Sequence, residues 1–134
     1  MSVTVLIVDD DKAVRFFHTV MVSQSGLSKD PLSFSNGEEA FTYLSEHYNN
    51  TDTDTWLILL DINMPEMNGW ELMDALKEKN YNNQVHIVMV TSSVDRADRE
   101  KAKLYSMVMD VVEKPISEED CKRIKIKSAI SQYF

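Results

Sequence analysis

Short runs of aliphatic and β-branched residues alternate along this chain with longer segments in which apolar residues recur at helical spacing. The short runs predict strands at about residues 4–8, 32–34, 56–60, 85–90 and 108–113. The longer segments predict helices at about 12–24, around 40–44, at 70–79, at 95–105 and from 117 onward. Strict alternation implies right-handed crossovers and parallel strands. We therefore predict an α/β fold, a doubly wound parallel sheet of five strands with five helices covering both faces.

Residues typical of helix ends and loops support these boundaries. Gly26 follows the first predicted helix, as glycine often does past a helix C-terminus. Ser117 precedes three acids, a typical helix start in which the side chains meet the positive end of the helix dipole. The polar stretch at 49–55 predicts a surface loop before the third strand.

Length, charge and cysteine content narrow the class of protein. A chain of 134 residues fits one compact domain, which we expect to span residues 1–134. The net charge of −8 argues against a nucleic-acid surface, and no stretch approaches the ~20 apolar residues of a membrane-spanning helix. The single cysteine, Cys121, excludes an internal disulfide and fits a reducing compartment. We expect a cytoplasmic protein, with Cys121 as a buried filler and the basic run 122–127 as the solvated face of the last helix.

Chemically active side chains follow four of the predicted strands. Asp9, Asp10 and Asp11 come after the first strand and Asp61 after the third. Thr91 and Lys114 come after the fourth and fifth strands. The carboxyl ends of parallel strands line one crevice, where ligands bind in open α/β sheets. Each of these residues alone is more simply explained by a structural role, such as forming a turn or being a surface lysine. Together they predict one functional site.

The acidic residues at this edge predict a metal ion. Asp9, Asp10 and Asp61 would repel one another without a cation. Mg²⁺ suits the set better than Ca²⁺, because Mg²⁺ takes one or two carboxylates, keeps several waters and shares a phosphate oxygen. Asp11 immediately precedes the first helix, so we assign it to capping the free N–H groups there.

The same edge predicts phosphoryl chemistry. Asp61 ends a nearly all-apolar run, which would hold it rigidly, and a carboxylate can attack phosphorus to form an acyl phosphate. Phosphoryl transfer asks mainly for positioning and charge neutralisation. Mg²⁺ and the Lys114 ammonium would neutralise charge, and the Thr91 hydroxyl would donate a hydrogen bond.

At these residues the chain resembles the response-regulator receiver domains of two-component signalling, over essentially all 134 residues. The motifs are Val8-Asp9-Asp10, Leu60-Asp61-Ile62-Asn63-Met64-Pro65 with Gly69, Thr91-Ser92 and Lys114-Pro115. Each is weak alone, but their order and their places on the strands are highly specific. The resemblance implies a flavodoxin-like sheet with strand order 2-1-3-4-5.

The resemblance also implies roles and partners. Asp61 would accept a phosphoryl group from a phosphohistidine on a sensor histidine kinase or histidine phosphotransfer protein. Mg²⁺ would bind Asp9, Asp10, Asp61 and the backbone carbonyl of Asn63, while Thr91 and Lys114 would contact the phosphoryl group. The Lys114-Pro115 peptide bond would be cis. The protein would be a stand-alone receiver without an output domain, and not an enzyme beyond Mg²⁺-dependent self-phosphorylation and autodephosphorylation.

The chain departs from the family pattern at one position in the fifth strand. Where the family carries an aromatic residue that rotates on activation, this sequence has Val111. Tyr105, Met107 and Met109 are nearby candidates to replace it, although core packing is their default role. Phosphorylation would act through docking to a downstream protein, onward phosphotransfer, or homodimerisation through the fourth helix, fifth strand and fifth helix. Asn63 and Ser93 would tune the lifetime of the phosphoryl group.

Two other functions compete with this interpretation. A haloacid-dehalogenase-like phosphatase also uses a strand-end aspartate with Mg²⁺, but it needs a second aspartate two residues later, where this chain has Asn63. A phosphorylation-independent interaction module on the same fold is favoured only by Val111. The glycine patterns of nucleotide-binding loops are missing, and the histidines at 18, 47 and 86 share no metal-binding spacing. An isolated helix histidine such as His18 is usually structural or surface-exposed.

Overall fold

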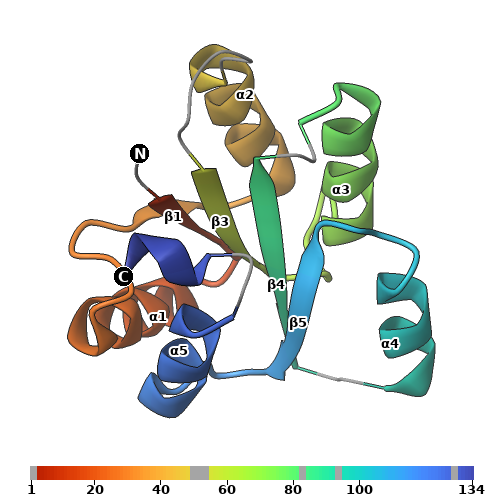
Figure 1. Ribbon diagram of the computed structural model, residues 1–134. Coiled ribbons are helices and arrows are strands. Elements are labelled where there is room, and N and C mark those ends of the chain that lie inside the picture. The colour runs from red at the N-terminus through yellow and green to blue at the C-terminus, as the bar shows by residue number, and fades with distance from the viewer. Residues whose placement is uncertain (1–2, 49–54, 82–83, 93–94, 128–129) are drawn as a thin grey trace.

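The computed structural model describes residues 3–48, 55–81, 84–92, 95–127 and 130–134. Its centre is a parallel sheet of five strands in the order β2-β1-β3-β4-β5 (Figure 1). The strands are β1 (Val3–Val8), β2 (Leu32–Phe34), β3 (Thr55–Leu60), β4 (Val85–Thr91) and β5 (Val108–Glu113). The predicted flavodoxin-like order is therefore confirmed.

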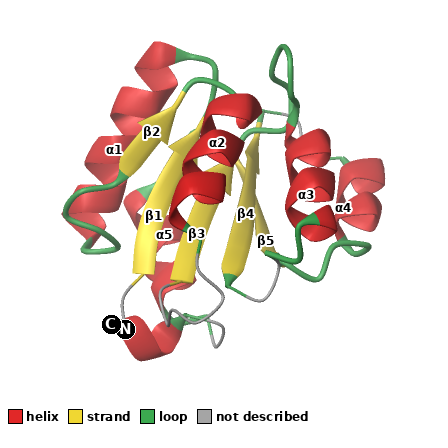
Figure 2. Cartoon of the chain, turned by 90° about the horizontal axis from the view of Figure 1, so that it is seen from above, coloured by secondary structure: helices red, strands yellow, loops and turns green. Residues whose placement is uncertain are grey.

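Helices cover both faces of the sheet (Figures 1 and 2). The α-helices of the described segments are α1 (Lys12–Ser25), α2 (Gly37–His47), α3 (Gly69–Glu78), α4 (Arg96–Ala102) and α5 (Glu118–Lys125). Helices α1 and α5 pack on one face, and α2 and α3 pack on the other, with α4 beyond them beside β5. None of the described helices has the length and apolar character needed to cross a membrane.

The sheet separates two hydrophobic cores. Leu6, Ile58 and Ile87 point into the core shared with α2 and α3, whereas their neighbours along each strand, such as Ile7 and Val88, face α1 and α5. Every residue of the central strand β3 is buried. This burial explains the continuous apolar run at 56–60, because a central parallel strand is covered on both faces. Cys121 is fully buried in the core beneath α5, as the sequence predicts.

Two predicted helix ends are wrong by a few residues. Helix α4 ends at Ala102 rather than near 105, and α5 ends at Lys125, before the end of the basic run. At both places the backbone tightens into turns that span three residues: the Leu104 N–H donates to the Lys101 carbonyl, and the Lys127 N–H to that of Ile124. A short 3₁₀ helix, Ser131–Tyr133, was not predicted. Most of the predicted loop at 49–55 lies outside the described residues.

The predicted helix caps are present. The Asp11 carboxylate accepts hydrogen bonds from the backbone N–H groups of Ala13 and Val14 at 2.9 and 3.2 Å. Ser117 and Asp120 form a reciprocal capping box at the start of α5. Gly26 closes α1 with φ = 79°, a left-handed conformation that glycine adopts without a steric penalty. The contacts of Asp11 confirm that it caps the N-terminus of α1.

Gly69 leaves no space for a side chain where α3 approaches the loop that follows β3. A Cβ atom there would lie 2.6 Å from Ile62 Cδ1 and 2.8 Å from the Asp61 carbonyl oxygen. We expect Gly69→Ala to lower the free energy of unfolding by about 1–3 kcal/mol, the usual cost of overpacking. Urea denaturation would measure this loss, with the exposed Glu78→Ala as a control in the same helix. A loss below about 0.5 kcal/mol, typical of an unconstrained surface position, would contradict the contact.

Candidate functional site

The carboxyl ends of β1 and β3 bring two aspartates together. These strands pair in parallel, with Val8 opposite Leu60, so that Asp9 and Asp61 follow them side by side. The Asp61 N–H donates to the Val8 carbonyl at 2.9 Å, which continues the ladder past the strand ends. Asp9 is 2% exposed and Asp61 is 3% exposed, whereas Asp10 is exposed. Buried carboxylates need a counter-charge, and the site supplies one.

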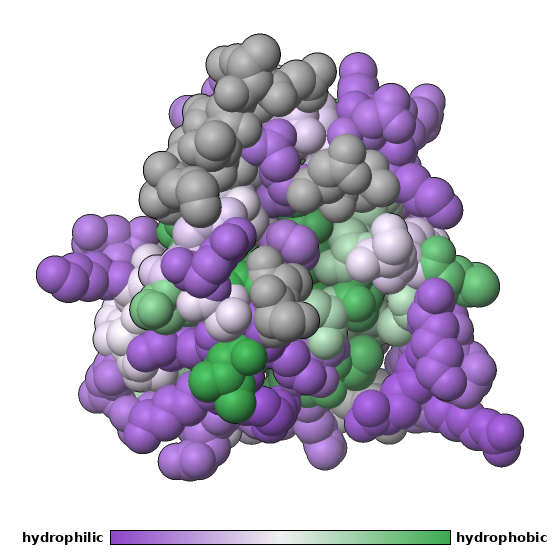
Figure 3. Space-filling view, viewed as in Figure 1, coloured by the Kyte–Doolittle hydropathy of each residue, from purple (hydrophilic) through white to green (hydrophobic). Residues whose placement is uncertain are grey.

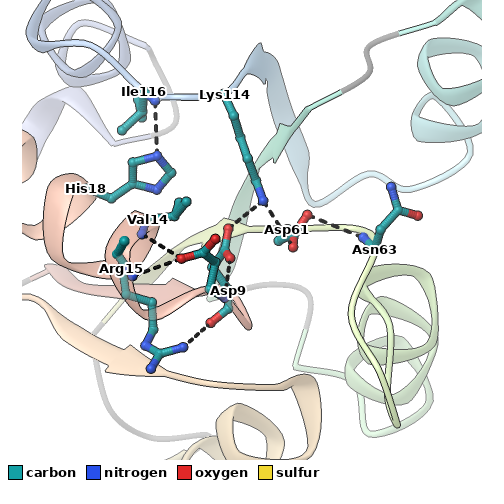
Figure 4. Close-up of polar contacts among 10 residues, drawn as sticks. Asp9, Val14, Arg15, His18, Asp61, Asn63, Lys114 and Ile116 are labelled. Carbon is teal, nitrogen blue, oxygen red and sulfur yellow. Dashed lines mark hydrogen bonds and ion pairs between the residues drawn. The ribbon is translucent and has the colours of Figure 1, made fainter.

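Lys114 reaches between the two buried carboxylates from the end of β5 (Figure 4). Its Nζ lies 2.7 Å from Asp9 Oδ2 and 3.2 Å from Asp61 Oδ2. The other oxygen of each carboxylate accepts a local backbone N–H: that of Asp11 for Asp9, at 2.9 Å, and that of Asn63 for Asp61, at 3.3 Å. Each carboxylate is therefore held by its own turn on one side and by a shared ammonium on the other.

Burial and neighbouring charges set the protonation of this site. Burial, and next the charge of Asp9, raise the pKa of Asp61 to about 6, although Lys114 acts in the opposite direction. Burial also disfavours the charge on Lys114, but the hydrogen bond to Asp9 and the charges of both aspartates outweigh it and raise the pKa of the ammonium. At neutral pH the site therefore holds an ionised Asp61 and a charged lysine.

Three carboxylates of the site fit a divalent cation. Asp9, Asp10 and Asp61 each offer one oxygen, and these oxygens lie within 4.8 Å of one another. Because Asp10 is exposed, the cation site is open to water on that side. This suits Mg²⁺, which keeps several water ligands in proteins. The side chain of Asn63 is exposed at the same rim, and the role of its carbonyl as a ligand stays a prediction.

Thr91 is the last residue of β4 and is fully buried. Its Oγ1 has no hydrogen-bond partner among the described residues. A buried hydroxyl without a partner is costly, so it suggests a group that arrives from outside. The Thr91 carbonyl accepts the Lys114 N–H at 2.9 Å, which ties the ends of β4 and β5 together. The structure thus gathers the sequence-predicted residues at one edge of the sheet, while Ser93 lies outside the described residues.

Two contacts of the site were not predicted. The Arg15 guanidinium donates to the Asp9 carbonyl at 2.7 Å, and the His18 ring accepts the Ile116 N–H at 3.1 Å. Arg15 and His18 lie three positions apart on α1, so they share one face of the helix. Other polar residues of α1 also lie three or four positions apart along the helix. Sequence spacing alone could not distinguish these partners.

The space beside Val111 is an open groove and is not filled by an aromatic side chain. Val111 is half-buried and lines a groove of about 540 Å³ between α4 and β5. Tyr105, a candidate replacement, donates a hydrogen bond to Asp74 at 2.9 Å and packs against Trp70 of α3. Met107 is buried in the core, which agrees with its default packing role.

The raised pKa of Asp61 makes the stability of the metal-free protein depend on pH. Near pH 4 the carboxyl group of Asp61 is largely protonated in the folded state, so it lowers the free energy of unfolding only slightly. As the pH rises from the unfolded value of 3.8 through the folded value of about 6, the buried group must ionise and stability is lost. With EDTA present, Asp61→Asn should therefore be about 2–3 kcal/mol more stable to unfolding than wild type at pH 7, with the advantage vanishing near pH 4. Urea titrations across this range would measure the difference, and an equal advantage at both pH values would contradict the shift.

The fold and the site define a class of protein: flavodoxin-like receivers with an acidic pocket that contains a lysine. Within this class, the chain belongs to the family of the response regulator receiver domain, whose family model matches residues 5–125. The predicted cis peptide bond between Lys114 and Pro115 is also present. The chain is therefore a receiver domain of two-component signal transduction.

Individual relatives show the same likeness. The chain is 32% identical to the two-component response regulator ARR22 of Arabidopsis thaliana over 133 residues, which cover 98% of this chain and 84% of that protein. It is 31% identical to the chemotaxis protein CheY1 of Helicobacter pylori over 93 residues, or 69% and 70% of the two chains. A crystal structure of a two-component response regulator from Cytophaga hutchinsonii superposes with a TM-score of 0.81 at 30% identity, covering 92% of this chain and 93% of that one.

Proposed function

We propose that this receiver domain accepts a phosphoryl group on Asp61 from a phosphohistidine on a sensor histidine kinase or a histidine phosphotransfer protein. The observation that carries the proposal is the environment of Asp61. Its buried carboxylate shares the Lys114 ammonium with Asp9. At the end of the next strand lies the Thr91 hydroxyl, which has no hydrogen-bond partner within the described part of the chain. The site thus contains a nucleophile, a cation and a hydrogen-bond donor.

The transfer needs an ionised Asp61. Its pKa of about 6 leaves the carboxylate mostly charged at neutral pH, so one of its oxygens can attack phosphorus. As the O–P bond forms, the P–N bond of the donor breaks and its electron pair returns to the histidine ring. Lys114 neutralises charge on the transferred group, and the Thr91 hydroxyl donates to one of its oxygens. Bound by Asp9, Asp10 and Asp61, Mg²⁺ would supply further neutralisation of the phosphoryl oxygens.

Phosphorylation changes the charge balance around Lys114. The phosphoryl group carries roughly −1.5 to −2 charges at pH 7, while the Asp61 carboxylate loses its own negative charge as it becomes an acyl phosphate. Lys114 would exchange its contact with Asp61 for one with the phosphoryl group, while the Thr91 hydroxyl would donate a hydrogen bond to it. The output would be docking of a downstream protein, dimerisation, or onward phosphotransfer. The protein would act as a signalling element and not as an enzyme with turnover on external substrates.

The experiment that tests this proposal is incubation of the protein with acetyl phosphate, with and without Mg²⁺, followed by intact mass spectrometry. We expect one phosphoryl adduct that forms only with Mg²⁺. Absence of an adduct, together with absence of Mg²⁺-dependent beryllofluoride binding, would contradict the proposal and favour a phosphorylation-independent interaction module.

A phosphatase would give a different result in a parallel assay. With p-nitrophenyl phosphate and Mg²⁺, it would release many equivalents of product per chain. We expect no such turnover, because Asn63 stands where that mechanism needs an acidic proton donor. Sustained release would support the phosphatase instead.

A further inference from the structure

A buried histidine on α1 remains outside the chemistry proposed above. His18 is 1% exposed, and its Nε2 accepts the backbone N–H of Ile116 at 3.1 Å (Figure 4). The two residues are 98 positions apart in the sequence, and Ile116 is itself fully buried. This hydrogen bond therefore joins α1 directly to the loop that carries Lys114.

The loop from Lys114 to Ser117 is held at each of its backbone positions that can donate. The Lys114 N–H donates to the Thr91 carbonyl of β4, and residue 115 is a proline without an N–H group. The Ile116 N–H donates to His18, and the Ser117 N–H donates to the Asp120 side chain of α5. His18 thus supplies a hydrogen bond from this loop to α1, the helix that begins directly after the acidic run 9–11.

The protonation of His18 suits this contact. Its Nε2 must be unprotonated to accept a hydrogen bond, so a neutral ring carries its proton on Nδ1. Burial lowers the pKa of His18 to about 4, with the charge of Asp9 opposing and that of Lys114 reinforcing this effect. The ring is therefore neutral, and able to accept, at neutral pH.

We propose that His18 is a positioning residue for the phosphoryl site: by holding the Ile116 N–H, it sets where the Lys114 ammonium lies relative to the carboxylates that follow β1 and β3. The observation behind this inference is that the loop and helix α1, distant in sequence, are joined by a buried hydrogen bond two residues from Lys114, whose ammonium contacts Asp9 at 2.7 Å. Its chemical meaning rests on the proposed function. The role predicts that losing the acceptor weakens recognition of a phosphoryl group more than it weakens binding of the metal alone.

Three substitutions at His18 separate this role from simple packing. His18→Leu keeps the bulk but removes the acceptor, and His18→Asn is polar but too short to reach the Ile116 N–H. His18→Gln places an amide oxygen close to the position of Nε2 and should restore the hydrogen bond. Val22→Ala, one turn further along the buried face of α1, is the matched control for loss of core packing.

The measurements are the affinity for Mg²⁺ alone, by calorimetry, and the affinity for beryllofluoride with saturating Mg²⁺, by fluorine NMR. In His18→Leu and His18→Asn we expect beryllofluoride affinity to fall about tenfold or more, the scale on which loss of a supporting contact affects a binding site. Mg²⁺ affinity should change less than about twofold, since the three carboxylates stay in place. His18→Gln and Val22→Ala should bind both ligands nearly as wild type does.

The outcomes separate this inference from the function on which it rests. Equal beryllofluoride affinity in wild type, His18→Leu and His18→Asn would overturn the positioning role alone, as would a loss in His18→Gln as large as that in His18→Leu. Equal losses of Mg²⁺ and beryllofluoride affinity would assign His18 to packing and also overturn it. Wild-type protein that bound Mg²⁺ but no beryllofluoride would overturn the proposed function, and the inference with it.

Discussion

Replacing Asp61 by asparagine is expected to abolish the phosphoryl adduct that acetyl phosphate and Mg²⁺ form on this protein. The carboxamide keeps the shape of the side chain, but its oxygen is far less nucleophilic than a carboxylate oxygen. It also removes a negative charge from the metal-binding set. Intact mass spectrometry over a time course would measure the effect, and we expect a reduction of at least about 1,000-fold, comparable to removing a nucleophile elsewhere.

A matched control is available on the surface of the protein. Asp30 is exposed and lies in the turn before β2, outside the acidic site. Asp30→Asn makes the same chemical change and should be phosphorylated at the wild-type rate. An adduct of wild-type yield in Asp61→Asn would contradict the assignment and would move the acceptor to another carboxylate, with Asp9 and Asp10 the first to test.

Removal of the Lys114 ammonium is expected to have the largest effect on stability. Lys114→Met keeps most of the aliphatic stem but leaves Asp9 and Asp61 buried without their shared cation. Breaking a buried ion pair from one side typically costs about 3–5 kcal/mol, and the side chain of Lys114 is 17% exposed, so we expect about 3 kcal/mol. Without Lys114 the pKa of Asp61 should rise further, so the loss should be greatest above pH 7 and smaller near pH 5. Urea denaturation at both pH values, in EDTA, would measure it.

A double variant tests whether that loss comes from the carboxylates. If repulsion between unpaired charges is the cause, Asp61→Asn in the Lys114→Met background should recover much of the lost stability. Simple additivity of the two single changes would show that the charges do not interact. A loss below about 1 kcal/mol in Lys114→Met, with no dependence on pH, would give the pair the character of a surface salt bridge and contradict the burial argument.

The strand ends and their chemistry could be predicted from the sequence because the signals are local. Apolar runs mark the strands, and residues directly after them must lie at one edge of a parallel sheet. This reasoning brings Asp9, Asp61, Thr91 and Lys114 together from their sequence positions alone. It also assigns Asp11 to the helix cap, because that residue stands where the first N–H groups are free.

Contacts between distant segments could not be predicted in the same way. The hydrogen bond between His18 and Ile116 depends on how α1 packs beside the β5–α5 loop, and no local pattern encodes that distance. The same holds for Arg15, whose guanidinium contacts a backbone carbonyl that every residue has. Helix ends were also imprecise, since the tightening of α4 and α5 into three-residue turns depends on tertiary packing.

The surroundings of Val111 show what could and could not be predicted from the sequence. The sequence identifies Val111 as smaller than the aromatic residue expected there, and the structure places it beside an open groove between α4 and β5. Tyr105 is engaged with Asp74 and Trp70 on the neighbouring helix α3. In Figure 3, hydrophilic side chains cover much of the helix surfaces, whereas hydrophobic side chains gather toward the gap between β5 and α4. Leu104, just after the end of α4, is exposed. Any signal relayed to this face would therefore have to pass through a packing arrangement different from that of an aromatic switch.

The most direct test of the central claim is to locate the phosphoryl group on the chain. An acyl phosphate on aspartate can be reduced by borohydride to homoserine, which survives digestion and peptide mass spectrometry. After treatment with acetyl phosphate and Mg²⁺, the account predicts homoserine at position 61 and no such conversion at positions 9 or 10. Conversion at another aspartate, or a phosphoryl group that survives borohydride because it is bound to a hydroxyl or a histidine, would contradict Asp61 as the phosphoacceptor.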